Sequence, residues 1–318
     1  MKVTKRQFGK KTGFTIIELL TVMSIIIILI SVLVPGLNLA RRYAKRVKQK
    51  AQFHSISVAL EQFSADPAHS SYPESGLLPV PPGVAPFTTG AQRLAEALMG
   101  RDRRGYDPQS SWDAALDSPS LDIYASLARG SIPQQVTDSL DRRKEGPYLP
   151  DAAAFQVGEL YAVPTGNVYD GIGVNPPAPV LTDEYTVKNV TVGGKAVKAG
   201  SPILYYKANS STVFPDTSGG GVIAITPADA DASRINSRDN EELIALGTVK
   251  SGVSVLHHFD PAYTDPGTLK DGRQIFYEAI TNTQMAPSWP YNQDSYILIS
   301  AGFDGIYGTT DDVFNFGE

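Results

Sequence analysis

The sequence predicts an α+β protein, in which one long N-terminal helix packs on a head that contains an antiparallel sheet. Three observations support this fold class. An uncharged apolar run lies near the start of the chain, an apolar stripe with helical spacing follows it, and short strand-like segments fill the last third. With 318 residues, of which 42% are apolar, the chain is long enough for one large domain or two small ones.

The first helix is expected from Phe14 to about Ala65. Residues 19–40 carry no formal charge, and a helix of that length spans roughly 33 Å, which is enough to cross a bilayer. Farther along, Phe53, Ile56, Leu60 and Phe63 recur at spacings of three and four, as in a helix packed along one side. Pro35 removes one backbone hydrogen bond, so we expect a bend or a local unwinding near residues 32–36.

The head is expected to begin with a loop and to end in strands. Pro- and Gly-rich residues 67–89 indicate an irregular loop, residues 90–102 a short helix, and residues 117–132 and 140–160 a mixture of short helices and loops. A hairpin is expected around Gly193-Gly194 within residues 185–208. Further strands are expected at four places: 222–226, 254–259, 273–280 and 294–300.

Charge is distributed unevenly along the chain. The first 13 residues hold five basic side chains and no acid, whereas the whole chain is at −5, so the remainder is at −10. An acidic body without a basic stripe argues against nucleic acid as a partner. The chain has no cysteine, which excludes disulfides and thiolate metal sites.

Glu18 is the one acid near the start of the apolar run. An ordinary signal peptide and a plain signal anchor both explain an apolar run, but neither explains an ionisable group, which is costly in lipid and indicates a function. No Lys, Arg or His lies between residues 12 and 40, so a partner must come from elsewhere. A cut between Gly13 and Phe14 would create an α-amino group four residues away, and that amine on one copy could neutralise Glu18 on the next.

The residues from Gly13 to Leu20 (GFTIIELL), preceded by Lys10-Lys11, resemble the processing motif of type IV prepilins and of type II secretion pseudopilins. The resemblance covers about residues 1–66 and 290–318 and is strongest to the major (G-type) pseudopilin, with an enlarged head between. It implies that a prepilin peptidase cuts after Gly13 and methylates Phe14. It also implies that Glu18 pairs with the Phe14 amine of a neighbouring copy, and that Pro35 is the helix-bending proline of these families.

This resemblance implies a pilin-like fold and a structural subunit that polymerises through its N-terminal helix. The subunit would sit in the bacterial inner membrane, with its N-terminus cytoplasmic and its head outside, and would assemble into a periplasmic or surface filament. Its partners would be the prepilin peptidase, an assembly platform protein with its ATPase, other pseudopilins and copies of itself. The domains expected are a leader, a membrane or filament-core helix, an amphipathic helix and an extracytoplasmic head: 1–13, 14–40, 41–66 and 67–318.

The C-terminal loop, residues 300–312, concentrates oxygen ligands. Asp304, Asp311 and Asp312 are separated by glycines that permit tight turns, and calcium takes six to eight oxygens, partly from main-chain carbonyls. The loop resembles the calcium loop of the major pseudopilin. That resemblance implies Ca²⁺ ligation by these three aspartates, completed by backbone or hydroxyl oxygens near three further residues: Ala301, Ile306 and Thr309.

Two other functions must be distinguished from that of a filament subunit. His257 and His258 are followed by an acid, but no nucleophile motif accompanies them, so we expect no enzymatic activity and no catalytic residues. The alternative to a filament subunit is a membrane-anchored extracytoplasmic protein that binds a ligand or mediates adhesion, in which the helix is only a tether.

Overall fold

A computed structural model describes most of the chain, and the described ranges are 13–67, 71–76, 89–100, 103–106, 147–150, 153–161, 178–185, 188–192, 194–213, 225–249, 255–285 and 289–317. Four expected features fall wholly or largely outside these ranges: the leader before Gly13, the loop at 77–88, the segment 117–132 and the start of the strand at 222–226. The chain divides into two compact parts, Met1–Lys45 and Arg46–Glu318.

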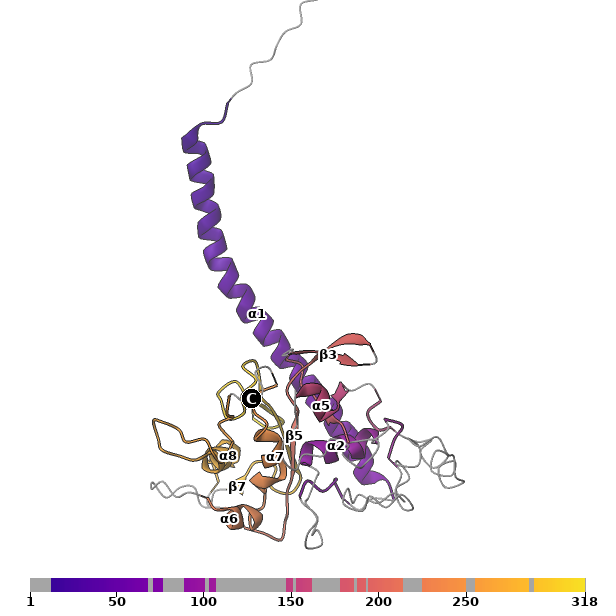
Figure 1. The fold of residues 1–318 in the computed structure, drawn as a ribbon. Coiled ribbons are helices and arrows are strands. Elements are labelled where there is room, and N and C mark those ends of the chain that lie inside the picture. Colours follow the sequence, from indigo (N-terminus) through magenta and orange to yellow (C-terminus); the bar gives the residue numbers. More distant parts are fainter. Residues whose placement is uncertain are drawn as a thin grey trace, which may run out of the picture. The chain divides into compact units, whose positions relative to one another are not determined.

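Helix α1 (Ile16–Ala65) begins two residues later than expected and ends where expected. Helical conformation continues through Pro35, and Figure 1 shows an uninterrupted ribbon over this stretch. Of the two outcomes expected for residues 32–36, local unwinding is therefore wrong, whereas a bend stays a prediction. Proline removes one donor from the helical ladder, but a single missing bond leaves the turns on either side intact.

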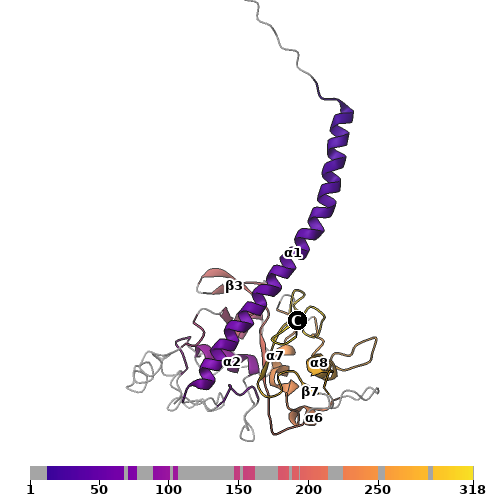
Figure 2. The same ribbon diagram turned by 180° about the vertical axis from the view of Figure 1, so that it is seen from behind.

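The second part of α1, beyond Lys45, carries the predicted stripe. Phe53, Ile56, Leu60 and Phe63 are all at most 3% exposed, which confirms that this face packs on the head. They share a core with helix α2 (Gly90–Met99), and both ribbon views place α2 beside the end of α1 (Figures 1 and 2). The helix predicted at residues 90–102 is thus confirmed, and it starts at a capping box formed by Thr89 and Gln92.

The described strands form four small antiparallel sheets, which confirms the α+β class at this coarse level. The pairs are β1 (Ala154–Phe155) with β2 (Val180–Leu181), β3 (Lys188–Val192) with β4 (Lys195–Ala199), and β6 (Thr281–Asn282) with β7 (Trp289–Pro290). The fourth sheet has the order β5 (Leu204–Lys207), β8 (Tyr296–Ser300) and β9 (Val313–Phe314). The hairpin and the strand at 294–300 are thereby confirmed.

The three-stranded sheet separates two hydrophobic cores. Because side chains alternate along a strand, Tyr205 and Leu298 face the core made with α1 and α2, whereas Tyr206 and Ile297 face the other core. Helix α8 (Gly272–Ile280) and the short helices α5 (Val157–Leu160) and α7 (Glu241–Ile244) contribute buried side chains to that other core. Two further short helices, α6 (Pro227–Asp231) and η2 (Ser237–Asn240), precede α7 in the chain.

Two predicted strands are wrong. Residues 273–280 form helix α8, because the side chain of Asp271 accepts a hydrogen bond from Gln274 N at 2.8 Å and caps a helix. Its buried residues Phe276, Tyr277 and Ile280 follow helical spacing, which the strand interpretation overlooked. The described residues 255–259 form a bend and turns rather than a strand, and they pack against the C-terminal loop.

Candidate functional site

The predicted processing point lies immediately before helix α1. Gly13 and Phe14 precede the first helical turn, and the Phe14 side chain is 78% exposed. Glu18 lies in the first turn, where its Oε2 accepts hydrogen bonds from Thr15 N at 2.8 Å and Thr15 Oγ1 at 2.7 Å. Glu18 N donates in return to Thr15 Oγ1 at 3.3 Å, so the pair forms a capping box.

Sequence reasoning missed this role of Thr15, although Thr-x-x-Glu is a recognisable cap signature. The cap supplies Glu18 with hydrogen-bond donors inside one chain. It also places the carboxylate within one helical turn of the residue that would become the new N-terminus. The cap needs only a hydrogen-bond acceptor at position 18, whereas charge pairing needs a negative charge there. A substitution that keeps the acceptor and removes the charge therefore separates the two roles.

The surface of α1 that follows Glu18 is apolar on all sides. Between Ile16 and Leu39, every large apolar side chain is exposed by 43% or more. The hydroxyls of Thr21, Ser24 and Ser31 each donate to a carbonyl of the preceding turn, at 2.8–3.0 Å, and so do not require water. By length and composition this is one helix capable of crossing a membrane.

The C-terminal loop folds around Asp311. Its Oδ2 accepts from the backbone amides of Phe303 and Asp304 at 2.7 and 3.0 Å, and its Oδ1 accepts from Thr309 Oγ1 at 2.6 Å. Gly302 has φ +64°, and a Cβ there would lie 2.2 Å from the Asp311 carbonyl oxygen. Only glycine permits so close an approach in this left-handed conformation.

The other two predicted ligands lie in the same loop. Asp304 Oδ1 accepts from Ile306 N at 2.8 Å, and Asp312 Oδ2 accepts from Gly308 N at 2.7 Å. The second oxygen of Asp312 is buried and has no hydrogen-bond donor among the described residues. Burial raises the pKa of Asp304, and burial raises that of Asp312 well above its usual range. Burial also acts on Asp311, but hydrogen bonds from Thr309 and from the backbone lower its pKa below the ordinary value.

These residues fit a calcium ion only in part. The unsatisfied oxygen of Asp312 and the negative field of three neighbouring carboxyls favour a cation. Against this, both oxygens of Asp311 are already taken by donors, and Ile306 O accepts from Thr309 Oγ1 at 3.3 Å. Among the described residues, no group of three or more His, Asp or Glu side chains is arranged to hold a metal ion. Ala301 is buried at the start of the loop.

The loop is held in place by residues from two other segments. Tyr307 N donates to His257 Nδ1 at 3.1 Å, and His258 N donates to Tyr307 O at 2.8 Å. Burial lowers the pKa of His257 to about 4, so its ring is neutral at pH 7 and accepts this bond. The histidine pair, which the sequence left without a role, therefore positions the C-terminal loop.

Asp183 fixes the strand that leads into the loop. Its Oδ2 accepts from Ser300 Oγ at 2.8 Å, and its Oδ1 accepts from the amides of Tyr185 and Ser201, both at 3.1 Å. The residue is only 5% exposed, and burial raises the pKa of its carboxyl to about 8. No sequence pattern pointed to this buried acid.

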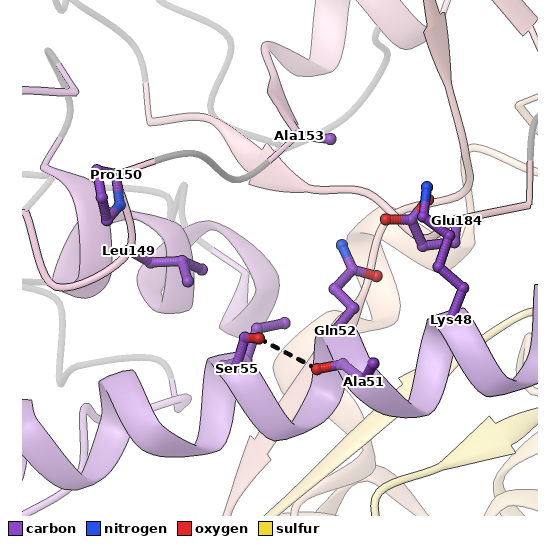
Figure 3. A pocket seen from close by; sticks show the side chains of 9 residues that line it. Lys48, Ala51, Gln52, Ser55, Leu149, Pro150, Ala153 and Glu184 are labelled. Atoms are coloured by element: carbon purple, nitrogen blue, oxygen red, sulfur yellow. Dashed lines mark hydrogen bonds and ion pairs between the residues drawn. The ribbon is translucent and has the colours of Figure 1, made fainter.

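A first cleft, the helix-side cleft, runs along the head segment of α1 and has a volume of about 460 Å³. Figure 3 shows Leu149 and Pro150 at one end of the cleft and Lys48 and Glu184 at the other. Lys48 and Glu184 form an ion pair at 2.6 Å. Gln52 lies between the two ends and donates from Nε2 to Thr182 O at 2.8 Å. The cleft is therefore apolar at one end and charged at the other.

A second cleft, the polar cleft, has a volume of about 430 Å³ and lies where the segment after Pro73, the end of β5 and the α6–η2 region meet. The described residues of its lining are polar apart from one glycine, and they are Glu74, Gly76, Lys207, Asn209, Asp231, Ser233, Arg234, Asn236, Arg238 and Asp239. No sequence motif identified this cleft, because its residues come from segments more than 130 positions apart.

Comparison with known proteins gives one distant similarity. No family model and no solved structure matches the chain. Penicillopepsin-1 of Penicillium janthinellum is 28% identical to it over 206 residues, which is 62% of this chain and 56% of that protein. The chain thus spans about half the length of the curated relative that it matches. Because that relative is an aspartic protease, the prediction that the chain has no enzymatic activity is contradicted and is withdrawn.

Proposed function

We propose that the chain is a structural subunit of a type IV pilin-like or type II secretion filament, processed between Gly13 and Phe14 and polymerised through its N-terminal helix. One observation carries the proposal. A helix with a fully exposed apolar surface begins just after the proposed cleavage point and holds a single carboxylate, Glu18, in its first turn. In water such a surface is unfavourable, so it requires lipid or the same surface of other copies.

Before assembly, the helix would anchor the chain in the bacterial inner membrane, with the basic leader cytoplasmic and the head on the far side. A prepilin peptidase would release the leader, and an assembly platform protein would extract the subunit. The new α-amino group of Phe14 on one copy would then meet Glu18 on a neighbouring copy. An ion pair in a low-dielectric filament core would fix the axial register, because an unpaired carboxylate there costs several kcal/mol.

The test separates charge pairing from helix capping. Glu18→Gln keeps an acceptor for Thr15 N but removes the charge, whereas Thr15→Val removes the cap hydroxyl but keeps the charge. In cells that contain the peptidase and the platform, we expect Glu18→Gln to lower filament yield at least tenfold and Thr15→Val to leave most filaments in place. Electron microscopy and sedimentation measure the yield, and normal filaments from Glu18→Gln would refute the proposal.

Cleavage of the leader can be measured separately from filament assembly. Mass spectrometry of the mature protein should show a chain that starts at Phe14 with a methylated amine. A chain that still starts at Met1 in cells with active peptidase would remove the basis for the charge pair.

We also propose that the C-terminal loop binds Ca²⁺ through Asp304 and Asp312, with Asp311 contributing after it releases one of its donors. The ion would supply charge compensation and cross-link the loop. The support is the buried, unsatisfied oxygen of Asp312 beside two further carboxyls. A chelator should therefore lower the thermal midpoint of the protein.

A further inference from the structure

The polar cleft contains a buried acceptor that the protein does not satisfy. Asp239 lines the cleft, is only 3% exposed, and lies on η2. Its Oδ2 accepts from Ser75 Oγ at 2.5 Å, but its Oδ1 has no hydrogen-bond partner among the described residues. A buried acceptor without a donor is unfavourable, so a ligand that supplies a donor would be stabilised at this oxygen.

Hydrogen bonds and ion pairs hold the side chains around Asp239 in place. Ser75 Oγ also accepts from Lys207 N at 2.7 Å, which ties the segment after Pro73 to strand β5. Arg238 Nη1 donates to Asp231 Oδ2 at 2.6 Å. Arg234 bonds to Asp294 at 3.0 Å, and its guanidinium lies 4.6 Å from the centre of the Trp289 ring. These contacts hold charged side chains in fixed positions around the cleft.

The charges of the lining indicate which ligand class fits. Among the described lining residues, three cationic side chains are matched by three carboxyls, so these residues present nearly balanced charge to an anion or a cation. The described lining holds no large apolar side chain, which excludes a lipid or an apolar peptide. What remains is a neutral ligand that both donates and accepts hydrogen bonds at short intervals, and the hydroxyls of a sugar ring do this.

The dimensions agree with such a ligand. A volume of about 430 Å³ lies in the range of small-molecule sites, which is about 300–1,000 Å³. Gly76 lines the cleft, and a Cβ built on it would lie 3.6 Å from Asp239 Oδ1, with no closer atom. The absence of a side chain at position 76 therefore keeps open the space next to the unsatisfied oxygen.

We infer that the polar cleft is a binding site for a neutral saccharide, in which Asp239 Oδ1 accepts a ring hydroxyl while Asn209 and Arg238 supply donors. Asn209 uses its Oδ1 for Ser211 N at 3.1 Å, which leaves its Nδ2 to donate. The inference concerns the head alone and goes beyond the filament function. A subunit with this site would carry sugar recognition on its head.

The experiment uses the full chain in lauryldimethylamine oxide micelles, a detergent that carries no sugar. Saturation-transfer NMR is run with glucose, galactose, mannose, N-acetylglucosamine, lactose and cellobiose, and with the charged sugars glucuronate and glucosamine. We expect saturation transfer to at least one neutral sugar and weaker or no transfer to the charged ones. No transfer to any neutral sugar, or transfer to charged sugars alone, overturns the inference.

Two variants locate the site. Asp239→Asn replaces the acceptor with a donor, and Gly76→Leu fills the adjacent space without a change of charge. Each should weaken binding at least tenfold, while Glu278→Gln, a carboxyl that pairs with Lys270 at 2.6 Å and does not line the cleft, should leave it unchanged. Unaltered binding in Gly76→Leu, with the thermal midpoint retained, would place any sugar elsewhere and overturn the assignment even if Asp239→Asn fails to fold.

Discussion

Asp183 should make the head less stable as the pH rises. Its pKa is about 8 in the folded chain, chiefly because of burial, with Glu184 contributing in the same direction, and about 4 in the unfolded chain. Between these values the folded state holds a proton that the unfolded state has lost, so raising the pH favours unfolding. The loss is about 1.4 kcal/mol per pH unit, which amounts to about 4 kcal/mol between pH 4 and pH 7.

Asp183→Asn isolates this effect. The amide oxygen can keep the bonds from Tyr185 N and Ser201 N, and the amide nitrogen can donate to Ser300 Oγ, so only the titrating group is lost. The variant should match the wild type near pH 4 and exceed its free energy of unfolding by about 4 kcal/mol at pH 7. Buried Asp239, whose pKa is about 7, titrates in both proteins and cancels in the difference.

The assay is urea unfolding of the full chain in a mild nonionic detergent, followed by near-ultraviolet circular dichroism at four pH values from 4 to 7. The informative quantity is the difference between variant and wild type at each pH. A difference that stays constant over this range would show that Asp183 is ionised in the folded state and would refute the reasoning.

Three further predictions concern packing, backbone and metal. Leu60→Ala, at a fully buried position, should lower the free energy of unfolding by about 2–5 kcal/mol, whereas Val58→Ala, at a side chain that is 45% exposed, should change it by less than about 0.5 kcal/mol; urea unfolding measures both. Gly302→Ala should cost more than Gly194→Ala, because both glycines have positive φ but only Gly302 has a backbone oxygen 2.2 Å from the built Cβ; the difference between their thermal midpoints measures the close contact. Calcium at 100 times its dissociation constant should add about 2.7 kcal/mol, and a thermal midpoint indifferent to a chelator would exclude the ion.

The sequence correctly predicted those parts of the fold that depend on residues close together in the chain. The stripe from Phe53 to Phe63, helix α2 and the hairpin around Gly194 each follow from spacing or turn chemistry within a few residues. The apolar residues of helix α8 also fit a strand when the cap at Asp271 is left out. With that cap included, the spacing favours a helix.

The candidate site residues likewise divide into those that the sequence indicates and those that only the folded structure reveals. Glu18 and the aspartates of the C-terminal loop stand out in the sequence because each is unusual in its own segment. Asp183 and Asp239 do not, because each has its effect only after folding, when Ser300 lies against one and Ser75 against the other. Their contacts span 117 and 164 residues. Burial, which shifts both pKa values, is a property of the tertiary fold, so no local pattern could have indicated it.

The two compact parts of the chain differ in how their apolar side chains are buried. Residues 46–318 contain both hydrophobic cores, so their stability depends on contacts such as those of Leu60 and on the state of Asp183. Within the described residues of the first part, the large apolar side chains of α1 are exposed, and their burial requires lipid or other chains. A change at Glu18 should therefore alter assembly and leave the unfolding of the head untouched, whereas Leu60→Ala should do the reverse. If Glu18→Gln lowered the stability of the head as well, loss of filaments could no longer be attributed to the missing charge.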